Sequence, residues 1–128
     1  MKKIIGLFMF LCILSLLKLY ANNNENEWVL HTQKEGVNFY VKIDTCENGQ
    51  QYFFVKIENT NIYKVDIKYK LNVTKNIIDG SKLGEIKMLA TDNQIIGTCS
   101  IAKLSFPILF SNAILNDIII YSEIFKNE

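Results

Sequence analysis

The strongest pattern in the sequence is an alternation of apolar and polar residues with a period of two. It is clearest between Tyr63 and Val73, where every second residue is apolar and the residues between them are lysine, aspartate or asparagine. Such alternation is typical of a β-strand with one face in the core and the other in solvent. Similar runs cover residues 37–43, 51–58, 85–90 and 94–101, and no stretch has convincing helical spacing. The pattern therefore predicts an all-β protein.

The runs 51–58 and 63–73 follow each other closely and predict an antiparallel hairpin around residues 59–62. In the register that places Val55 opposite Ile67 on the inner face, Lys56 faces Asp66 on the outer face. Neighbouring registers place like charges together or apolar residues among lysines, which disfavours them. We therefore expect these two strands to be neighbours in one sheet.

The remaining segments are less regular. Residues 77–84 contain Asp79 and Gly80 and predict a loop, while Pro107 limits residues 104–110 to an edge strand or a break because proline cannot donate to a ladder. A last strand is expected at residues 115–125, where three consecutive isoleucines at 118–120 favour a central position or burial on both faces.

About seven strands without helices favour a single two-layer antiparallel β-sandwich that is immunoglobulin-like in architecture. A small open β-barrel is the alternative. Trp28 precedes both Cys46 and Cys99, so the order Cys, Trp, Cys of antibody domains is absent. The resemblance to immunoglobulin domains is thus one of architecture alone.

The first 21 residues have the features of a secretory signal peptide. Lys2 and Lys3 precede an uncharged run at residues 4–17 that is apolar apart from Ser15, and Ala21 offers a small residue for cleavage. The run spans roughly 21 Å as a helix, less than the roughly 30 Å hydrocarbon core, which disfavours the alternative of an uncleaved anchor. We expect a flexible tether at residues 22–27, a β-sandwich domain at residues 28–128 and a secreted or periplasmic protein without a membrane span.

Charge narrows the possible partners. Cleavage would remove Lys2, Lys3 and Lys18 and change the formal net charge from +1 to −2, which disfavours nucleic acid as a ligand. All basic residues are lysines, so the planar bidentate recognition of carboxylate or phosphate that arginine provides is absent.

Two cysteines, Cys46 and Cys99, remain after the expected cleavage. An even number of cysteines in an exported chain favours a structural disulfide. The alternative, a metal or redox pair, lacks both C-x-x-C spacing and a nearby histidine.

Several short segments together resemble small secreted proteins of unassigned function from Bacteroidetes. They are the leader, Trp28, the segments Gly36–Tyr40 and Val55–Asn61, and the late Gly97–Cys99, with Cys46 and Val65 at matching places. The resemblance implies a bacterial envelope setting and brings no activity or catalytic residue with it.

The chain has little that suggests catalysis. His31 is the only histidine, and no nucleophile lies at a recognisable spacing from it, which favours a surface or strand-edge role. Asp79, Asp92 and Asp117 are too dispersed for a calcium loop, and no phosphate-binding glycine motif is present. We therefore expect no catalytic residue, no metal and no cofactor.

One predicted surface suggests a function. In the hairpin described above, Tyr52 and Phe54 share the outer face with Lys68 and Lys70, which makes an aromatic and lysine patch suited to a protein or glycan partner. The alternative is that another strand covers the rings. We expect a non-enzymatic binding module, and our second hypothesis is an envelope or matrix component that assembles through the strand edges of residues 115–125. The sequence leaves the oligomeric state open.

Overall fold

The computed structural model describes residues 27–76 and 80–127. The expected signal peptide, almost all of the tether and part of the loop expected at residues 77–84 lie outside the described residues. The described chain contains the following eight strands and two short 3-10 turns: β1 (Val29–Lys34), β2 (Val37–Thr45), β3 (Gln51–Asn59), β4 (Lys64–Val73), β5 (Ser81–Leu89), β6 (Gln94–Ile96), η1 (Ala102–Leu104), β7 (Ser105–Pro107), η2 (Leu115–Asp117) and β8 (Ile118–Asn127).

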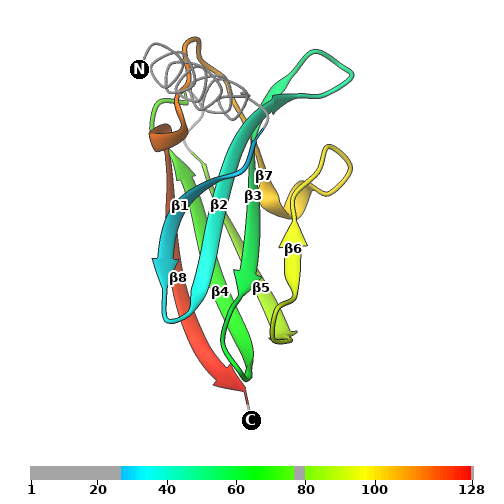
Figure 1. Ribbon diagram of the computed structural model, residues 1–128. Coiled ribbons are helices and arrows are strands. Elements are labelled where there is room, and N and C mark those ends of the chain that lie inside the picture. Colours follow the sequence, from blue (N-terminus) through cyan, green and yellow to red (C-terminus); the bar gives the residue numbers. More distant parts are fainter. Residues whose placement is uncertain (1–26, 77–79, 128) are drawn as a thin grey trace, which may run out of the picture.

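The strands form two antiparallel sheets that pack face to face (Figure 1). Sheet A has the order β1-β2-β3-β6, and β7 pairs with β3 beyond the end of β6. Sheet B has the order β5-β4-β8. The two sheets do not close on each other, so the two-layer sandwich is confirmed and the open-barrel alternative is wrong.

The predicted hairpin between residues 51–58 and 63–73 is wrong, because β3 and β4 lie in different sheets. β3 instead pairs along its whole length with β2, where Val41 faces Val55. β4 pairs along its whole length with β8, where Lys68 faces Glu123. The loop at residues 60–63 therefore carries the chain from one sheet to the other.

Buried Asn59 stabilises this change of sheet. Its side-chain Nδ2 donates to the main-chain oxygens of Tyr63 and Leu89, and its Oδ1 accepts from the main-chain N–H of Asn61, all at 2.9 Å. Because each bond ends on sheet B or on the loop, one amide holds the end of β3 against the neighbouring layer.

The inner faces of both sheets form one hydrophobic core, as the alternation predicts. Every second residue of β4 from Val65 to Val73 is buried, and the same holds for Val37, Phe39 and Val41 of β2. Leu104 and Ile118 close the core from the irregular segments around η1 and η2.

Some strand boundaries differ from those expected. β5 begins at Ser81, so residues 81–84 belong to a strand and not to a loop, while the strand expected at residues 94–101 ends at Ile96. Pro107 ends the edge strand β7, as expected. β8 is an edge strand, so the central position inferred from three isoleucines is wrong; only Ile118 is fully buried, and Ile119 and Ile120 are half-buried.

Side chains join the two sheets along both sides of the sandwich. On one side, His31 Nε2 lies 2.8 Å from the main-chain oxygen of Ile118, and Lys34 Nζ donates to that of Ser122 at 2.6 Å. On the other side, Lys82 Nζ donates to the main-chain oxygens of Ala102 and Ser105. His31 is thus the strand-edge histidine expected from the sequence.

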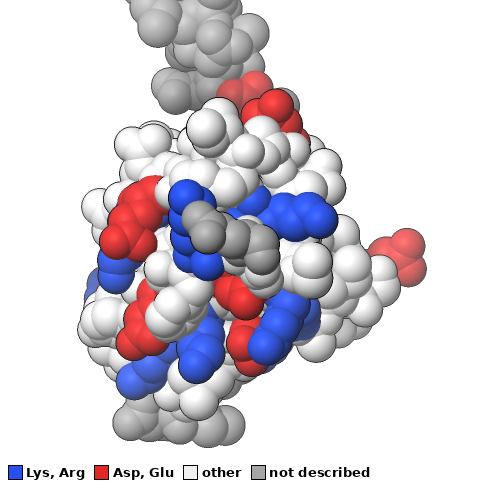
Figure 2. All heavy atoms as spheres, turned by 90° about the horizontal axis from the view of Figure 1, so that it is seen from below, with Lys and Arg blue, Asp and Glu red and all other residues white. Residues whose placement is uncertain are grey.

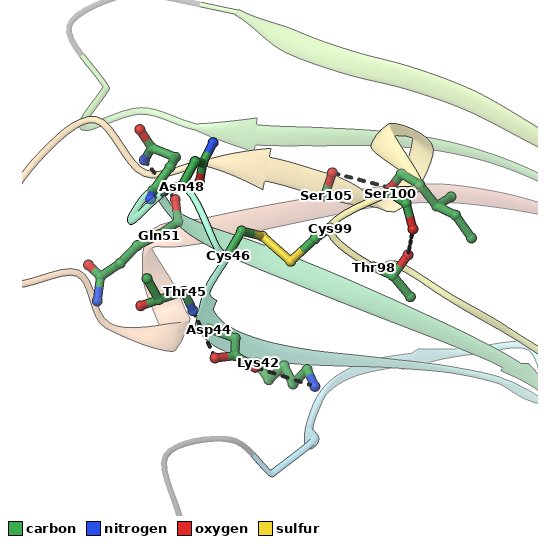
Figure 3. The surroundings of a disulfide bond; sticks show 12 residues. Lys42, Asp44, Thr45, Cys46, Asn48, Gln51, Thr98, Cys99, Ser100 and Ser105 are labelled. Atoms are coloured by element: carbon green, nitrogen blue, oxygen red, sulfur yellow. Dashed lines mark hydrogen bonds and ion pairs between the residues drawn. A yellow bond between two sulfur atoms is a disulfide. The ribbon is translucent and has the colours of Figure 1, made fainter.

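Cys46 and Cys99 form the expected disulfide, with their Cα atoms 5.9 Å apart. The bond ties the turn after β2 to the loop after β6, at one end of sheet A (Figure 3). Since the two residues are 53 positions apart, the bond closes a loop that covers just over half of the residues that the structure describes.

Candidate functional site

The four residues of the predicted patch do not form one surface. Tyr52 and Phe54 lie on β3 in sheet A, whereas Lys68 and Lys70 lie on β4 in sheet B. Phe54 is only 2% exposed and Tyr52 is half-buried, while both lysines are exposed. The grouping was wrong because it depended on the hairpin between β3 and β4. Each pair nevertheless has aromatic and lysine neighbours of its own.

The outer face of sheet B places Lys68 and Lys70 beside two other rings. Lys68 Nζ lies 5.6 Å from the ring centre of Phe125, and Lys70 Nζ lies 5.7 Å from that of Tyr121. On the other side of β4, Lys70 faces Leu83 of β5. We call this surface the lysine-aromatic face; it consists of Lys68, Lys70, Leu83, Tyr121 and Phe125.

Three apolar side chains of the lysine-aromatic face are open to solvent. Leu83 is 76% exposed, Tyr121 52% and Phe125 46%. Lys68 lies between Glu85 and Glu123 on the neighbouring strands, so the charges on this face alternate in sign. The face thus combines exposed apolar area with charged groups able to orient a partner.

The outer face of sheet A carries a second aromatic and lysine cluster, which is more tightly packed. Lys56 Nζ lies 4.4 Å from the ring centre of Tyr40 and 5.4 Å from that of Trp28, and Lys42 Nζ lies 4.8 Å from the Trp28 ring. These four residues are half-buried. Tyr52 and Phe54 continue the cluster along β3, with ring centres 5.8 Å apart.

Sequence reasoning missed this second cluster, although a signal for it exists. Tyr40 and Lys42 occupy outward positions in the alternation of β2, and Lys56 occupies one in β3. Pairing residues 37–45 with residues 51–59 across the turn at Gly49 would have placed Tyr40 opposite Lys56. The contact with Trp28 depends on the path of the chain before β1 and has no comparable signal.

An open depression of about 550 Å³ lies at the end of the sandwich near the C-terminus. It is lined by Glu35, Asn61, Tyr63, Ile124 and Lys126. Two of its polar side chains already interact with the protein, since Asn61 Nδ2 donates to the main-chain oxygen of Glu35 and Lys126 lies over the Tyr63 ring. Figure 2 views the molecule from this end and shows acidic and basic side chains intermingled, without a field of one sign.

Two carboxylates outside the aromatic and lysine clusters have lowered pKa values. The pKa of Asp66 is lowered mainly by hydrogen bonds from the Asn127 side chain and the Met88 main-chain N–H. The pKa of Asp117 is lowered mainly by the Ile114 main-chain N–H and by Lys75, whose Nζ lies 2.8 Å away. In both cases the bonds are local and structural, and they fix the ends of β4, β5 and η2.

The structure shows no metal-binding cluster of histidine, cysteine and carboxylate groups within residues 27–76 and 80–127. Across the same residues, no helix has the length and apolarity needed to cross a membrane. The disulfide between Cys46 and Cys99 is compatible with an extracellular location.

The chain matches no known protein family, no curated protein and no solved structure. The resemblance to small secreted proteins of Bacteroidetes therefore stays a prediction.

Proposed function

We propose that the protein is an exported, non-enzymatic binding module that recognises a protein partner through the lysine-aromatic face of sheet B. The observation that carries the proposal is the exposure of Leu83, Tyr121 and Phe125 on one face of a three-stranded sheet. Burying large apolar and aromatic side chains against a partner is favourable, and such residues commonly anchor protein interfaces. Lys68 and Lys70 lie among them and can select a partner with acidic groups.

Export is supported by two independent features. The first 21 residues have the charge and apolar pattern of a cleavable leader, and the Cys46–Cys99 bond is of a kind that persists in oxidising compartments. We expect the mature chain to begin at Asn22 and to reside in the periplasm or outside the cell. N-terminal sequencing of the protein recovered from the producing cells tests this directly, and an intact Met1 would contradict it.

Assembly through strand edges, our second hypothesis, has weaker support. The outer edge of β8 already receives the side chains of His31 and Lys34 from β1. The other edge of sheet B, β5, has an irregularity near Met88, whose φ of 56° interrupts the regular strand. Occupied and irregular edges oppose the addition of further strands.

The proposed face can be tested by comparing three forms of the mature protein as bait for the envelope fraction of the producing cells. One form is the wild type, the second is the Leu83→Ala, Tyr121→Ala double variant, and the third is Ile62→Ala. Ile62 is the matched control because it is 93% exposed yet lies in the loop between the sheets. Both alanine variants should keep the wild-type thermal unfolding midpoint, because they remove only exposed side chains.

We expect the wild type and Ile62→Ala to recover the same protein in equal amounts, and the double variant to recover at least tenfold less. Loss of two exposed apolar anchors commonly weakens an interface by this factor or more. Equal recovery by all three forms, or recovery of nothing by the wild type, would overturn the proposal.

A further inference from the structure

The outer face of sheet A contains a line of hydrogen-bonding side chains that crosses four strands. Gln33 of β1 faces Asn38 of β2, Asn38 faces Glu58 of β3, and Glu58 faces Gln94 of β6. We call these four residues the amide row. Because neighbouring strands lie about 4.8 Å apart, the amide row is about 14 Å long. Its three amides both donate and accept hydrogen bonds, and its carboxylate accepts them.

The centre of the amide row is held in place but not fully satisfied. Asn38 Nδ2 donates to Glu58 Oε1 at 3.2 Å, and the Tyr40 hydroxyl donates to the same oxygen at 3.4 Å. Asn38 Oδ1 is buried and has no hydrogen-bond partner among the residues that the structure describes. A buried acceptor without a donor is unfavourable, and a ligand hydroxyl that reaches Asn38 Oδ1 would donate to it.

An apolar line runs beside the amide row. It consists of four residues that face one another in register across the same four strands: Leu30, Tyr40, Lys56 and Ile96. They lie two positions from the amide row on β2, β3 and β6, and three positions from it on β1, where the register shifts. Leu30 and Ile96 are exposed, and the Lys56 ammonium lies over the Tyr40 ring, so its aliphatic stem lies along the apolar line. The surface thus places hydrogen-bonding groups next to apolar groups over the width of the sheet.

Sugar rings have a matching distribution of groups, with hydroxyls around the ring edge and C–H groups on its faces. Charge on the sheet A face then selects among sugars. Lys42 and Lys56 are balanced by Asp44 and Glu58, and Lys42 Nζ lies 3.9 Å from Asp44 Oδ2. Balanced charge gives no attraction for a polyanion.

We propose that the amide row and the apolar line beside it bind a neutral glycan chain laid across strands β1, β2, β3 and β6. This site is on the opposite side of the sandwich from the lysine-aromatic face and does not depend on it. Hydroxyls of successive sugar units hydrogen-bond to Gln33, Asn38, Glu58 and Gln94, and the sugar faces pack on Leu30, Tyr40 and Ile96.

The test is affinity electrophoresis of the mature protein in native gels that contain one soluble polysaccharide each. A β-glucan, a mannan and a galactan represent neutral chains, and alginate represents an acidic one. The proteins compared are the wild type, Asn38→Ala, Gln94→Ala and, as a control from sheet B, Leu83→Ala. Gln94 is exposed, so Gln94→Ala keeps the fold even if Asn38→Ala lowers stability.

We expect at least one neutral polysaccharide to slow the wild type and Leu83→Ala equally. For Gln94→Ala and Asn38→Ala, the dissociation constant derived from the mobility should rise at least fivefold. The proposal is overturned if no neutral chain slows the wild type, if alginate alone does so, or if the Gln94→Ala protein is slowed as much as the wild type. Recovery of a protein partner that depends on Gln94 would assign this face to a protein instead.

Discussion

Tyr69 lies directly opposite Gly84 in sheet B, and its ring occupies the space that a Cβ atom on Gly84 would need. The Tyr69 hydroxyl continues past Gly84 and donates to the main-chain oxygen of Lys103 at 2.9 Å. The glycine thus allows a central residue of β4 to reach across β5 to η1 and to close that side of the core.

Substitution of Gly84 by alanine should therefore destabilise the fold. The new methyl group would displace the Tyr69 ring, and overpacking of this kind costs about 1–3 kcal/mol. Urea denaturation of Gly84→Ala and the wild type measures the difference. Gly80→Ala is the control, because no atom of the described residues lies within 4 Å of the Cβ position at Gly80. Equal losses in the two variants would contradict this account.

Alkaline pH should destabilise the protein through Tyr69. Burial raises the pKa of its hydroxyl from 10.0 to about 12. A pKa that is raised in the folded state favours folding below the unfolded value of 10.0, and this contribution is lost as the pH rises from 10 towards 12. Unfolding free energies of the wild type should fall more steeply over this range than those of Tyr69→Phe. Parallel curves for the two proteins would show that Tyr69 is not responsible.

The location of the core was predictable from the sequence because it depends only on local alternation. Val65, Ile67 and Leu71 are fully buried, as the period-two pattern of β4 requires. The pairing of strands was not predictable in the same way. The predicted hairpin was chosen by aligning residues 51–58 with residues 63–73 alone. In the structure these two strands form longer ladders with other partners, β3 with β2 and β4 with β8.

The predicted aromatic and lysine patch was wrong for the same reason. A patch that spans two strands depends on which strands are neighbours, so the wrong hairpin joined Phe54 to Lys68 although they lie in different sheets. Lys68 lies on an outward face, as expected, but the aromatic ring beside it belongs to Phe125, 57 residues along the chain, and not to Tyr52 or Phe54. A contact between segments that distant has no signature in local spacing.

Loss of the disulfide should greatly weaken the fold. Closing a loop between residues 53 positions apart lowers the entropy of the unfolded chain by an amount worth about 4 kcal/mol. We expect the Cys46→Ser, Cys99→Ser double variant to lose about this amount in guanidinium denaturation, a large part of the stability of a domain of this size. Dithiothreitol should lower the midpoint of the wild type and leave the variant unchanged. A wild type insensitive to reduction would contradict the prediction.

Asp117 should contribute to stability at neutral pH and lose this contribution in acid. Its pKa lies below the ordinary value of 3.8 because the Ile114 N–H and Lys75 both bind the ionised carboxylate. A lowered pKa stabilises the fold above the unfolded value, and the effect disappears as the pH falls through the folded value. Asp117→Asn should thus be less stable than the wild type at pH 7, and the difference should shrink below about pH 4. A difference that is constant with pH would exclude a role for the charge.

Lys34 should protect the edge of β8 from adding further strands. It lies on the edge strand β1 opposite inward-facing Val37, and its Nζ donates to the main-chain oxygen of Ser122 on β8. An inward-pointing lysine at an edge opposes pairing with another chain, because the new strand would have to bury the charge. Lys34→Val would remove that charge, leave the Ser122 oxygen without its donor and place a strand-forming residue on the edge.

We expect the average mass of Lys34→Val, measured by light scattering after size-exclusion chromatography, to rise with concentration more steeply than that of the wild type. Lys64→Val is the control, because Lys64 is an exposed lysine of the central strand β4. If both variants behave like the wild type, edge protection does not depend on Lys34.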